Sequence, residues 1–316
     1  MPPVLRLMVE PHTGGTYAQF LRLARAAEEA GYDAFFRSDH LYFDADPPRP
    51  ALEAWTTLAA LARDTARIRL GTLVTPATFR HPSVLAREVA TVDELSGGRL
   101  EIGMGTGWYD IEHTTLGIPF PPQRERTERL EEAVEMVRLL WSGERVSFAG
   151  RHHRLDNAVA LPRPVQDPFP LIVGGHGGPR SVALAARHAS EYNTTSIDPA
   201  GAAETFRKAR EACERAGRDP DTLRLSWMGT VLVAPDQNTL RHRAAQMAAW
   251  TGSPGEDPDQ LIAAISARSV VGVHEQAAER LREYAGAGAQ RIYARIWDLD
   301  DVDQVAEIQG SVLAAV

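Results

Sequence analysis

An apolar run that ends in polar and titratable side chains is the first sign of chemistry in this chain. Phe35 and Phe36 read as a buried strand, and Ser38-Asp39-His40 follow almost at once. Enzymes built on parallel sheets place reactive groups where strands end. Imidazole has an ordinary pKa near neutrality, so His40 can give or take a proton and is the candidate catalytic residue. A hydrogen-bonded structural histidine is the alternative.

Two glycine-rich segments follow other strand-like runs and are candidate ligand loops. Gly103-Met104-Gly105-Thr106-Gly107-Trp108 would let a flat ligand or a phosphate approach the backbone, but it lacks the spacing of a dinucleotide fingerprint. Gly174-Gly175-His176-Gly177-Gly178 runs into Pro179-Arg180-Ser181, where a helix is predicted to begin. Free amides and the helix dipole favour an anion there, although the lysine of a P-loop is missing. This segment is either a phosphate loop or an ordinary turn.

These groups can meet only if the strand ends converge. Eight short apolar runs alternate with helix-like stretches, which is typical of buried parallel strands. We therefore predict a single α/β domain over residues 1–316, a closed (β/α)8 TIM barrel, with an open doubly wound sheet as the alternative. The expected strands are Leu5–Val9, Ala34–Arg37, Ile68–Val74, Leu100–Met104, Leu171–Gly174, Tyr192–Ser196, Leu223–Val233 and Arg291–Trp297.

Helices are expected between the strands, and three segments interrupt the alternation. Residues 105–125 read as a long loop inserted after strand four, and 143–169 as a small hairpin before strand five. Residues 251–273 read as an insertion after strand seven that holds a short helix, Pro258–Ala267. Loops of this length are usually lids or contacts between subunits. The other expected helices are Tyr17–Ala30, Trp55–Arg63, Ser83–Leu95, Thr127–Trp141, Pro179–His188, Gly201–Ala216, Thr239–Trp250, Glu275–Ala285 and Asp301–Val312.

The composition argues against several classes of protein. The net charge of −8 and scattered basic residues give no nucleic-acid footprint. No apolar run approaches the roughly 20 residues of a membrane-spanning helix, and no signal-peptide pattern is present. The single cysteine, Cys213, rules out an internal disulfide and a cysteine metal site, which fits a cytoplasmic location. Neither a zinc motif nor a hydrolase nucleophile elbow occurs, so no metal is expected.

Six segments, taken in order, resemble the luciferase-like monooxygenase superfamily of flavin and deazaflavin enzymes. The resemblance covers essentially the whole chain, and the order of the motifs is far more specific than any one of them. It looks nearest to the branch that uses the deazaflavin coenzyme F420. The segments are Ser38-Asp39-His40, Leu70-Gly71-Thr72-Leu73-Val74-Thr75, Phe79-Arg80-His81-Pro82, Asp93-Glu94-Leu95-Ser96-Gly97-Gly98-Arg99, Gly105-Thr106-Gly107-Trp108, and Gly174-Gly175 with Glu191-Tyr192-Asn193.

The resemblance implies a barrel, usually dimeric, whose strand ends carry the tricyclic ring of the cofactor. It also implies a cis peptide between Leu73 and Val74 that supports one face of the ring. His40 would stand near the reactive carbon and polarise or protonate the substrate during hydride transfer. The implied cofactor contacts are Asp39, Leu73, Val74, Thr75, Thr106, Gly107, Gly174, Gly175 and Gly177, with Arg180 added because of its place in the loop.

One position departs from the pattern. Related sugar-phosphate dehydrogenases carry an acidic residue directly after Gly-Thr-Gly, where this chain has Trp108. We therefore expect His40 to work without an acidic partner, and we do not expect a sugar phosphate as substrate. Trp108, Tyr109 and Phe120 predict an aromatic substrate pocket, or they merely close the barrel top. The loops 42–54, 108–125 and 251–273 are expected to shape that pocket.

The expected function is that of an oxidoreductase that transfers a hydride between F420 and an organic small molecule. The first alternative is an FMN-dependent monooxygenase supplied with reduced flavin by a partner reductase. The others are a barrel that binds flavin without turnover, and a lyase or hydrolase with His40 as base. A homodimer is expected, with no nucleic-acid or membrane partner, and an F420 or flavin reductase is a candidate supplier of reduced cofactor.

Overall fold

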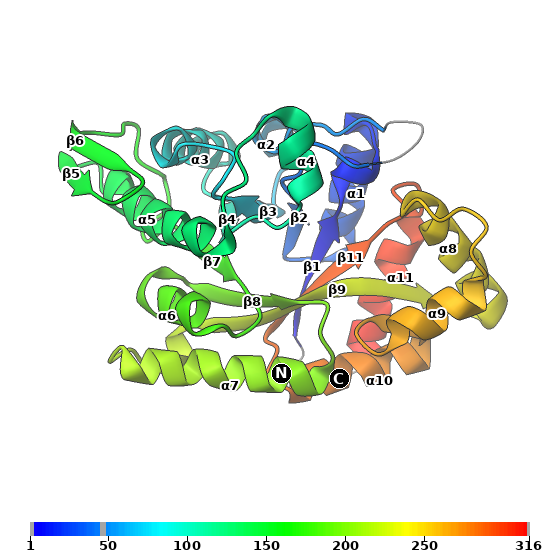
Figure 1. Ribbon diagram of the computed structural model, residues 1–316. Helices are drawn as coiled ribbons and strands as arrows, with labels where there is room; N and C mark the ends of the chain where they lie inside the picture. The colour runs from blue at the N-terminus through cyan, green and yellow to red at the C-terminus, as the bar shows by residue number, and fades with distance from the viewer. Residues whose placement is uncertain (1–2, 45–48, 315–316) are drawn as a thin grey trace.

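The computed structural model describes residues 3–44 and 49–314, and it contains the predicted barrel (Figure 1). Eight parallel strands pair in the order β1-β2-β3-β4-β7-β8-β9-β11, and β11 returns to β1. The pairing of β8 with β9 closes the sheet, which excludes the open alternative. The strands are β1 Val4–Val9, β2 Ala34–Arg37, β3 Arg69–Pro76, β4 Leu100–Gly105, β7 Leu171–Gly174, β8 Glu191–Thr195, β9 Arg224–Ala234 and β11 Arg291–Ile296.

The nine predicted helices that alternate with the strands are all present, with ends that shift by a few residues. Local signals explain the ends: a capping box at Thr16 starts α1, and Gly31 ends it in the left-handed conformation. Asp198 caps α7 ahead of a proline in its first turn. These helices are α1 Tyr17–Ala30, α2 Ala54–Asp64, α3 Pro82–Ser96, α5 Gln123–Trp141, α6 Pro179–His188, α7 Pro199–Arg215, α8 Gln237–Trp250, α10 His274–Gly286 and α11 Val302–Ala314.

The three interrupting segments are more ordered than the sequence suggested. The predicted hairpin is present as β5 Val146–Ala149 and β6 Arg154–Ala158. The predicted loop 105–125 is wrong in part, because it contains α4 Asp110–Leu116 and the first turn of α5. In 251–273 the expected short helix is α9 Pro258–Ser266, and a strand was missed, β10 Val270–Val273. This strand pairs with Val231–Ala234, the end of β9 that continues beyond its barrel neighbours.

A charged network fills the amino-terminal end of the barrel interior. Arg6 is fully buried and donates to Glu101 at 2.6 Å and to the Tyr293 hydroxyl at 3.0 Å. Tyr293 in turn donates to Glu191 at 2.7 Å, and Arg291 pairs with the same carboxylate. Burial alone would raise the pKa of Glu101, but the charges of Arg6, Arg291 and Arg69 lower it to about 2. This end of the barrel is therefore tied together by ion pairs.

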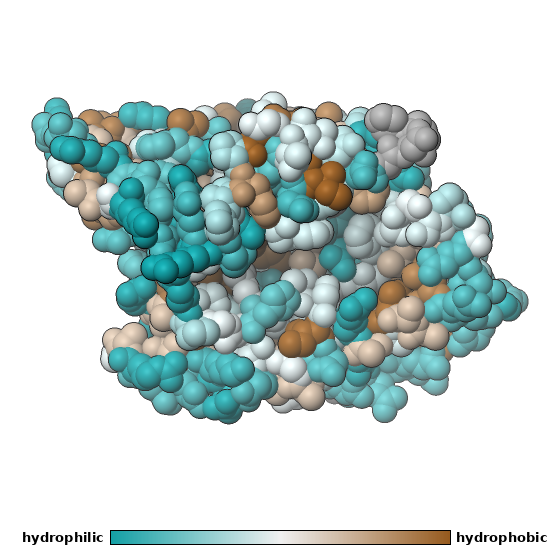
Figure 2. Space-filling view, viewed as in Figure 1, coloured by the Kyte–Doolittle hydropathy of each residue, from teal (hydrophilic) through white to brown (hydrophobic). Residues whose placement is uncertain are grey.

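An apolar layer separates this network from the carboxyl ends of the strands. It is a small cluster of inward-facing side chains from different strands, among them Met8, Phe36, Ile172 and Met228. The apolar cluster thus separates the charged network at the amino-terminal end of the barrel from the polar groups at the carboxyl ends of the strands. On the surface, Figure 2 shows apolar side chains gathered over α4, where Ile111 and Leu116 are exposed. None of the helices in the described part of the chain is long and apolar enough to span a membrane.

Candidate active site at the carboxyl ends of the strands

His40 lies just beyond β2 and is held by a buried carboxylate. Its Nδ1 lies 2.8 Å from Oε1 of Glu112, and the other oxygen of Glu112 accepts the Leu41 amide at 3.0 Å. The His40 side chain is 12% exposed and that of Glu112 only 1%. A carboxylate can only accept hydrogen bonds, so Nδ1 carries a proton and Nε2 is the nitrogen that can exchange one.

The charges around His40 favour its protonated form. Burial by itself would lower the pKa of His40. The hydrogen bond to Glu112 and the negative charges of Glu112, Glu10 and Asp39 outweigh that effect and raise the pKa. The imidazole is therefore suited to store a proton and to release it to, or take it from, a neighbouring group.

The expectation that His40 lacks an acidic partner is wrong. Glu112 supplies one from α4, four residues after Trp108. Glu112 lies within 105–125, a segment for which the sequence predicts a loop. As a helix, this segment directs Glu112 and His113 inward together, and both are buried. Recognising one helical turn after Tyr109 would have revealed the pair.

Side chains that point inward from α4 and its flanks hold this helix over the barrel. His113 hydrogen bonds through Nε2 to the Thr78 hydroxyl at 2.8 Å and lies 4.6 Å from the Phe120 ring, measured between ring centroids. The guanidinium of Arg126 stacks 3.9 Å from the centroid of the same ring and also donates to the Gly107 carbonyl. Phe120 thus packs against His113 and Arg126, in support of α4.

Trp108 and Tyr109 are the two predicted pocket aromatics whose rings stand beside His40. Their centroids lie 5.8 Å and 6.0 Å from the imidazole, both edge-on. Trp108 is 72% exposed, so its ring is accessible from solvent beside the imidazole. The Tyr109 hydroxyl accepts the amide of Asp44. Within the predicted pocket loop 42–54, residues 45–48 lie outside the described part of the chain.

Asp39 and Thr75 come together as neighbouring strands predict, but a third residue binds Asp39. Thr75 donates to Asp39 at 2.9 Å, and Arg80 donates to both carboxylate oxygens, at 2.7 Å and 3.3 Å. Asp39 is fully buried, and Arg80 also pairs with Glu53. Any contact of Asp39 with a cofactor must coexist with these bonds. The Phe79-Arg80-His81-Pro82 motif was noticed in the sequence, but the role of Arg80 in it was not.

The predicted cis peptide between Leu73 and Val74 is present, and the β3–β4 register shifts between Thr72 and Thr75. Val74 then lies against glycines of two other strands. A Cβ at Gly105 would stand 2.5 Å from a methyl group of Val74, one at Gly103 2.9 Å, and one at Gly174 3.2 Å. Only glycine fits so closely. Val74 and the glycines at 103, 105 and 174 therefore form a wall with a single projecting side chain, that of Val74. A surface of this shape suits a flat ring.

The second glycine loop is braced by side chains that the sequence did not suggest. The Gly177 amide donates to the Tyr192 hydroxyl and the Gly175 amide to the Asn193 carbonyl, both at 2.9 Å. A Cβ on Gly177 would lie 3.4 Å from the stem of Lys208, the one lysine of the chain, which reaches this loop from α7. The stem of a lysine therefore lies beside the loop, and its ammonium group pairs with Glu204 at 3.4 Å. Arg180, exposed at the start of α6, pairs instead with Glu131 at 2.6 Å.

The family profile of luciferase-like monooxygenases matches residues 5–291. The chain belongs to this family. It is 41% identical over 206 residues to the F420-dependent glucose-6-phosphate dehydrogenase of Nakamurella multipartita, covering 64% of this chain and 59% of that protein. It is 34% identical over 241 residues to the F420-dependent hydroxymycolic acid dehydrogenase of Mycobacterium tuberculosis, covering 75% and 65%. Each alignment spans less than two thirds of the relative.

A solved structure supports the fold over the full length of the chain. The coenzyme F420-dependent tetrahydromethanopterin reductase of Methanopyrus kandleri superposes with a TM-score of 0.81, at 20% identity, and covers 99% of both chains. The contacts described above divide the predicted site residues of this luciferase-like family member into two groups at the carboxyl ends of the strands. One group surrounds His40 and Val74, and the other surrounds the Gly174–Gly177 loop. Thr106 lies in the first group, where its hydroxyl bonds to the Gly107 carbonyl at 3.2 Å.

Proposed function

We propose that this protein is an oxidoreductase that transfers a hydride between coenzyme F420 and an organic small molecule. The observation that carries the proposal is His40, held by the buried Glu112 and placed among the strand ends that include Val74 and its glycines. Both relatives described above are named F420-dependent dehydrogenases, which supports this cofactor. When bound, a deazaflavin supplies two-electron hydride chemistry.

The residues present fit such a cofactor in two places. The wall formed by Leu73, Val74 and Thr75 over the glycines would face the ring, with Thr106 and Gly107 at its edge. Gly174, Gly175 and Gly177 would lie along the phosphate-bearing chain, and Lys208, which pairs with Glu204 at 3.4 Å, would reach an anion there by exchanging that partner. Because Arg180 is paired with Glu131, it would reach an anion only by exchanging that partner.

We propose that His40 accepts or donates the proton that moves when a hydride is transferred. When a substrate alcohol is oxidised to its carbonyl, Nε2 would take the hydroxyl proton, and F420, when bound, would supply the acceptor for the hydride. In the opposite direction His40 returns the proton to the carbonyl oxygen. Glu112 stabilises the imidazolium in both directions.

The substrate that these surroundings favour is an alcohol or ketone with an apolar body. Trp108 and Tyr109 offer aromatic faces next to His40, and Trp108 stands where the related sugar-phosphate dehydrogenases carry an acid. We therefore expect turnover of medium-chain secondary alcohols or their ketones and none of glucose 6-phosphate. Turnover of glucose 6-phosphate alone would contradict this substrate class without contradicting the use of F420.

A cofactor titration tests the proposal most directly. We expect the protein to quench or shift the fluorescence of F420 and to leave FMN unaffected. Tight FMN binding, with oxygen consumption once a reductase is added, would instead identify a two-component monooxygenase. F420 binding without turnover across a panel of alcohols and ketones would leave a flavin-binding barrel. The homodimer, the reductase partner and the cytoplasmic location stay predictions.

A further inference from the structure

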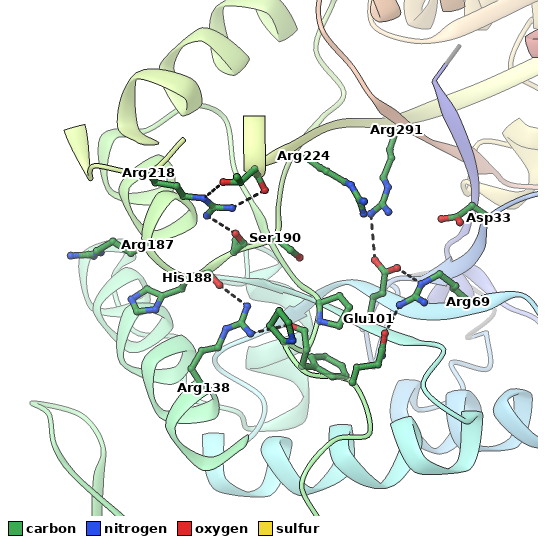
Figure 3. A pocket seen from close by; sticks show the side chains of 16 residues that line it. Asp33, Arg69, Glu101, Arg138, Arg187, His188, Ser190, Arg218, Arg224 and Arg291 are labelled. Carbon is green, nitrogen blue, oxygen red and sulfur yellow. Dashed lines mark hydrogen bonds and ion pairs between the residues drawn. The ribbon is translucent and has the colours of Figure 1, made fainter. Parts of the chain in front are cut away.

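A second cavity opens at the amino-terminal end of the barrel, and Figure 3 shows the residues that line it. His40 lies beyond the carboxyl end of β2, at the opposite end of the barrel. The volume of the cavity is about 820 Å³, within the range of pockets for ligands of nucleotide size. Its walls come from residues at or before the first positions of several strands: Asp33 precedes β2, Arg69 begins β3, Ser190 precedes β8, and Arg224 begins β9. The apolar layer of the barrel separates it from the candidate active site.

The lining of this cavity is strongly basic, although the chain as a whole carries a net charge of −8. Two carboxylates, Asp33 and Glu101, also line it, so the arginines exceed them by four positive charges. A basic surface on an acidic protein concentrates anions locally. The arginines are Arg69, Arg138, Arg187, Arg218, Arg224 and Arg291.

On one wall, two arginines donate only to uncharged acceptors. Arg138 donates to the carbonyls of Phe169 and His188, at 2.8 Å and 2.6 Å. Arg218 donates to the Ala189 carbonyl at 2.7 Å and to the Thr222 hydroxyl at 2.7 Å. These bonds hold the side chains in place, but no formal negative charge neutralises them.

The opposite wall holds Arg224, Arg291 and Arg69 near Glu101, and Figure 3 shows the guanidinium groups of Arg224 and Arg291 directed toward that carboxylate. Arg291 pairs with Glu191, and Arg69 with Glu101. Arg224 is exposed, and it forms no ion pair with any residue in 3–44 or 49–314. Its guanidinium therefore faces the cavity without an ion pair of its own among the described residues.

Burial and neighbouring positive charges act together on two groups that line the cavity. Burial, and after it the charge of Arg218, lowers the pKa of Arg138. Burial, and after it the charge of Arg187, lowers the pKa of His188, which also lines the cavity. Positive charges that disfavour one another in this way are relieved when an anion binds among them. Arg187 itself points away from the other arginines in Figure 3, so we leave it out of the binding set.

We propose that this cavity is a binding site for a small organic polyphosphate of nucleotide size. Arg138 and Arg218 on one wall and Arg224 with Arg291 on the other would each take phosphate oxygens, because the planar guanidinium matches phosphate in a bidentate manner. Two separated arginine pairs require at least two phosphate groups. Pro168 and Pro170, between the walls, offer an apolar surface to the organic part.

Calorimetric titration with ATP, and separately with tripolyphosphate, tests the proposal. We expect one ATP to bind per chain and to bind more tightly than tripolyphosphate. Arg224→Gln should weaken ATP binding about tenfold or more, because it removes a charge-assisted bond, and Arg224→Glu should abolish it. Arg224 is exposed and unpaired, so neither change removes a contact that the fold needs.

Arg210→Gln is the matched control. Arg210 is also half-exposed and lies on α7, but it pairs with Asp221 and does not line the cavity. We expect this variant to bind ATP like the unchanged protein, and F420 binding to be unaffected by ATP. The proposal is overturned if ATP does not bind, if the Arg224 and Arg210 variants bind it equally well, if tripolyphosphate binds as tightly as ATP, or if ATP displaces F420.

Discussion

The two ends of this barrel contain the same kinds of charged residue but differ in the ratio of cationic side chains to carboxylates. At the carboxyl ends, the two cations closest to the candidate site both pair with carboxylates: His40 with Glu112 and Arg80 with Asp39. At the amino-terminal end, arginines outnumber the carboxylates. The hydrogen bond to Glu112 and its charge raise the pKa of His40 against the effect of burial, whereas burial, and after it the charge of Arg187, lowers the pKa of His188. The fold fixes where strands end, and the neighbouring charges then decide what a histidine there can do.

The largest expected effect concerns turnover. His40→Ala should lower turnover by about a hundredfold to ten-thousandfold, because it removes the group that carries the proton. F420 binding should be retained. His188→Ala, at the other end of the barrel, is the matched control and should turn over normally. Steady-state kinetics and a fluorescence titration on both variants decide this, and unchanged turnover in His40→Ala would remove His40 from the mechanism.

The next effect concerns stability at the amino-terminal end. Glu101→Gln should lower the free energy of unfolding by about 3 kcal/mol, because it removes the carboxylate that pairs with both Arg6 and Arg69 and leaves the buried Arg6 with Asp33 as its remaining ion-pair partner. Glu131→Gln, which breaks the exposed pair with Arg180, should cost about 0–1 kcal/mol. Urea unfolding followed by circular dichroism measures both. Equal losses in the two variants would mean that the internal network does not hold the barrel together.

The pKa of Glu101 also predicts the pH range over which this network stabilises the folded protein. The folded pKa of Glu101 is about 2 and its ordinary value is 4.5, so its contribution to stability is present above pH 4.5. It is lost as the pH falls from 4.5 toward 2. The unfolding free energy of Glu101→Gln should therefore fall less steeply with acid than that of the unchanged protein over this window. Parallel pH dependences would contradict the assignment.

A smaller effect should follow from Glu112→Gln. Without the carboxylate, burial dominates at His40, so its pKa should fall and the corresponding limb of the kcat/KM pH profile should move to lower pH. Turnover at the new optimum should fall about tenfold. Glu112→Asp keeps the charge and should move the limb less. An unchanged pH profile of kcat/KM in Glu112→Gln would show that Glu112 contributes only to the packing of α4 against the barrel.

The smallest effect is a direct test of the comparison between the two histidines. Ring nitrogen NMR, assigned with His40→Gln and His188→Gln, should place the pKa of His40 above 6.5 and that of His188 below it. For His40 the linked stability is present below pH 6.5 and lost as the pH rises through its folded pKa. For His188 it is present above pH 6.5 and lost as the pH falls. The reverse order of the two values would undo the comparison.

Most of the fold could be predicted from the sequence because buried parallel strands have continuous apolar sequences. All eight barrel strands were found in this way, and the glycine and proline signals placed the helix ends. The two missed elements, α4 and β10, are short. Helix α4 has seven residues, too few to display a helical period, and β10 depends on the outer half of a neighbouring strand for its partner.

The sequence by itself determined which residues stand at the strand ends. It placed His40 after β2 and glycines after β4 and β7, while the family resemblance implied the cis peptide between Leu73 and Val74 that the structure contains. Only the tertiary structure decided which charges meet. Glu112 reaches His40 across 72 residues of chain, Lys208 comes to the Gly177 loop from α7, and arginines from separate elements surround one cavity. Periodicity reports the face on which a side chain lies, but the identity of its partner depends on contacts between segments far apart in the chain.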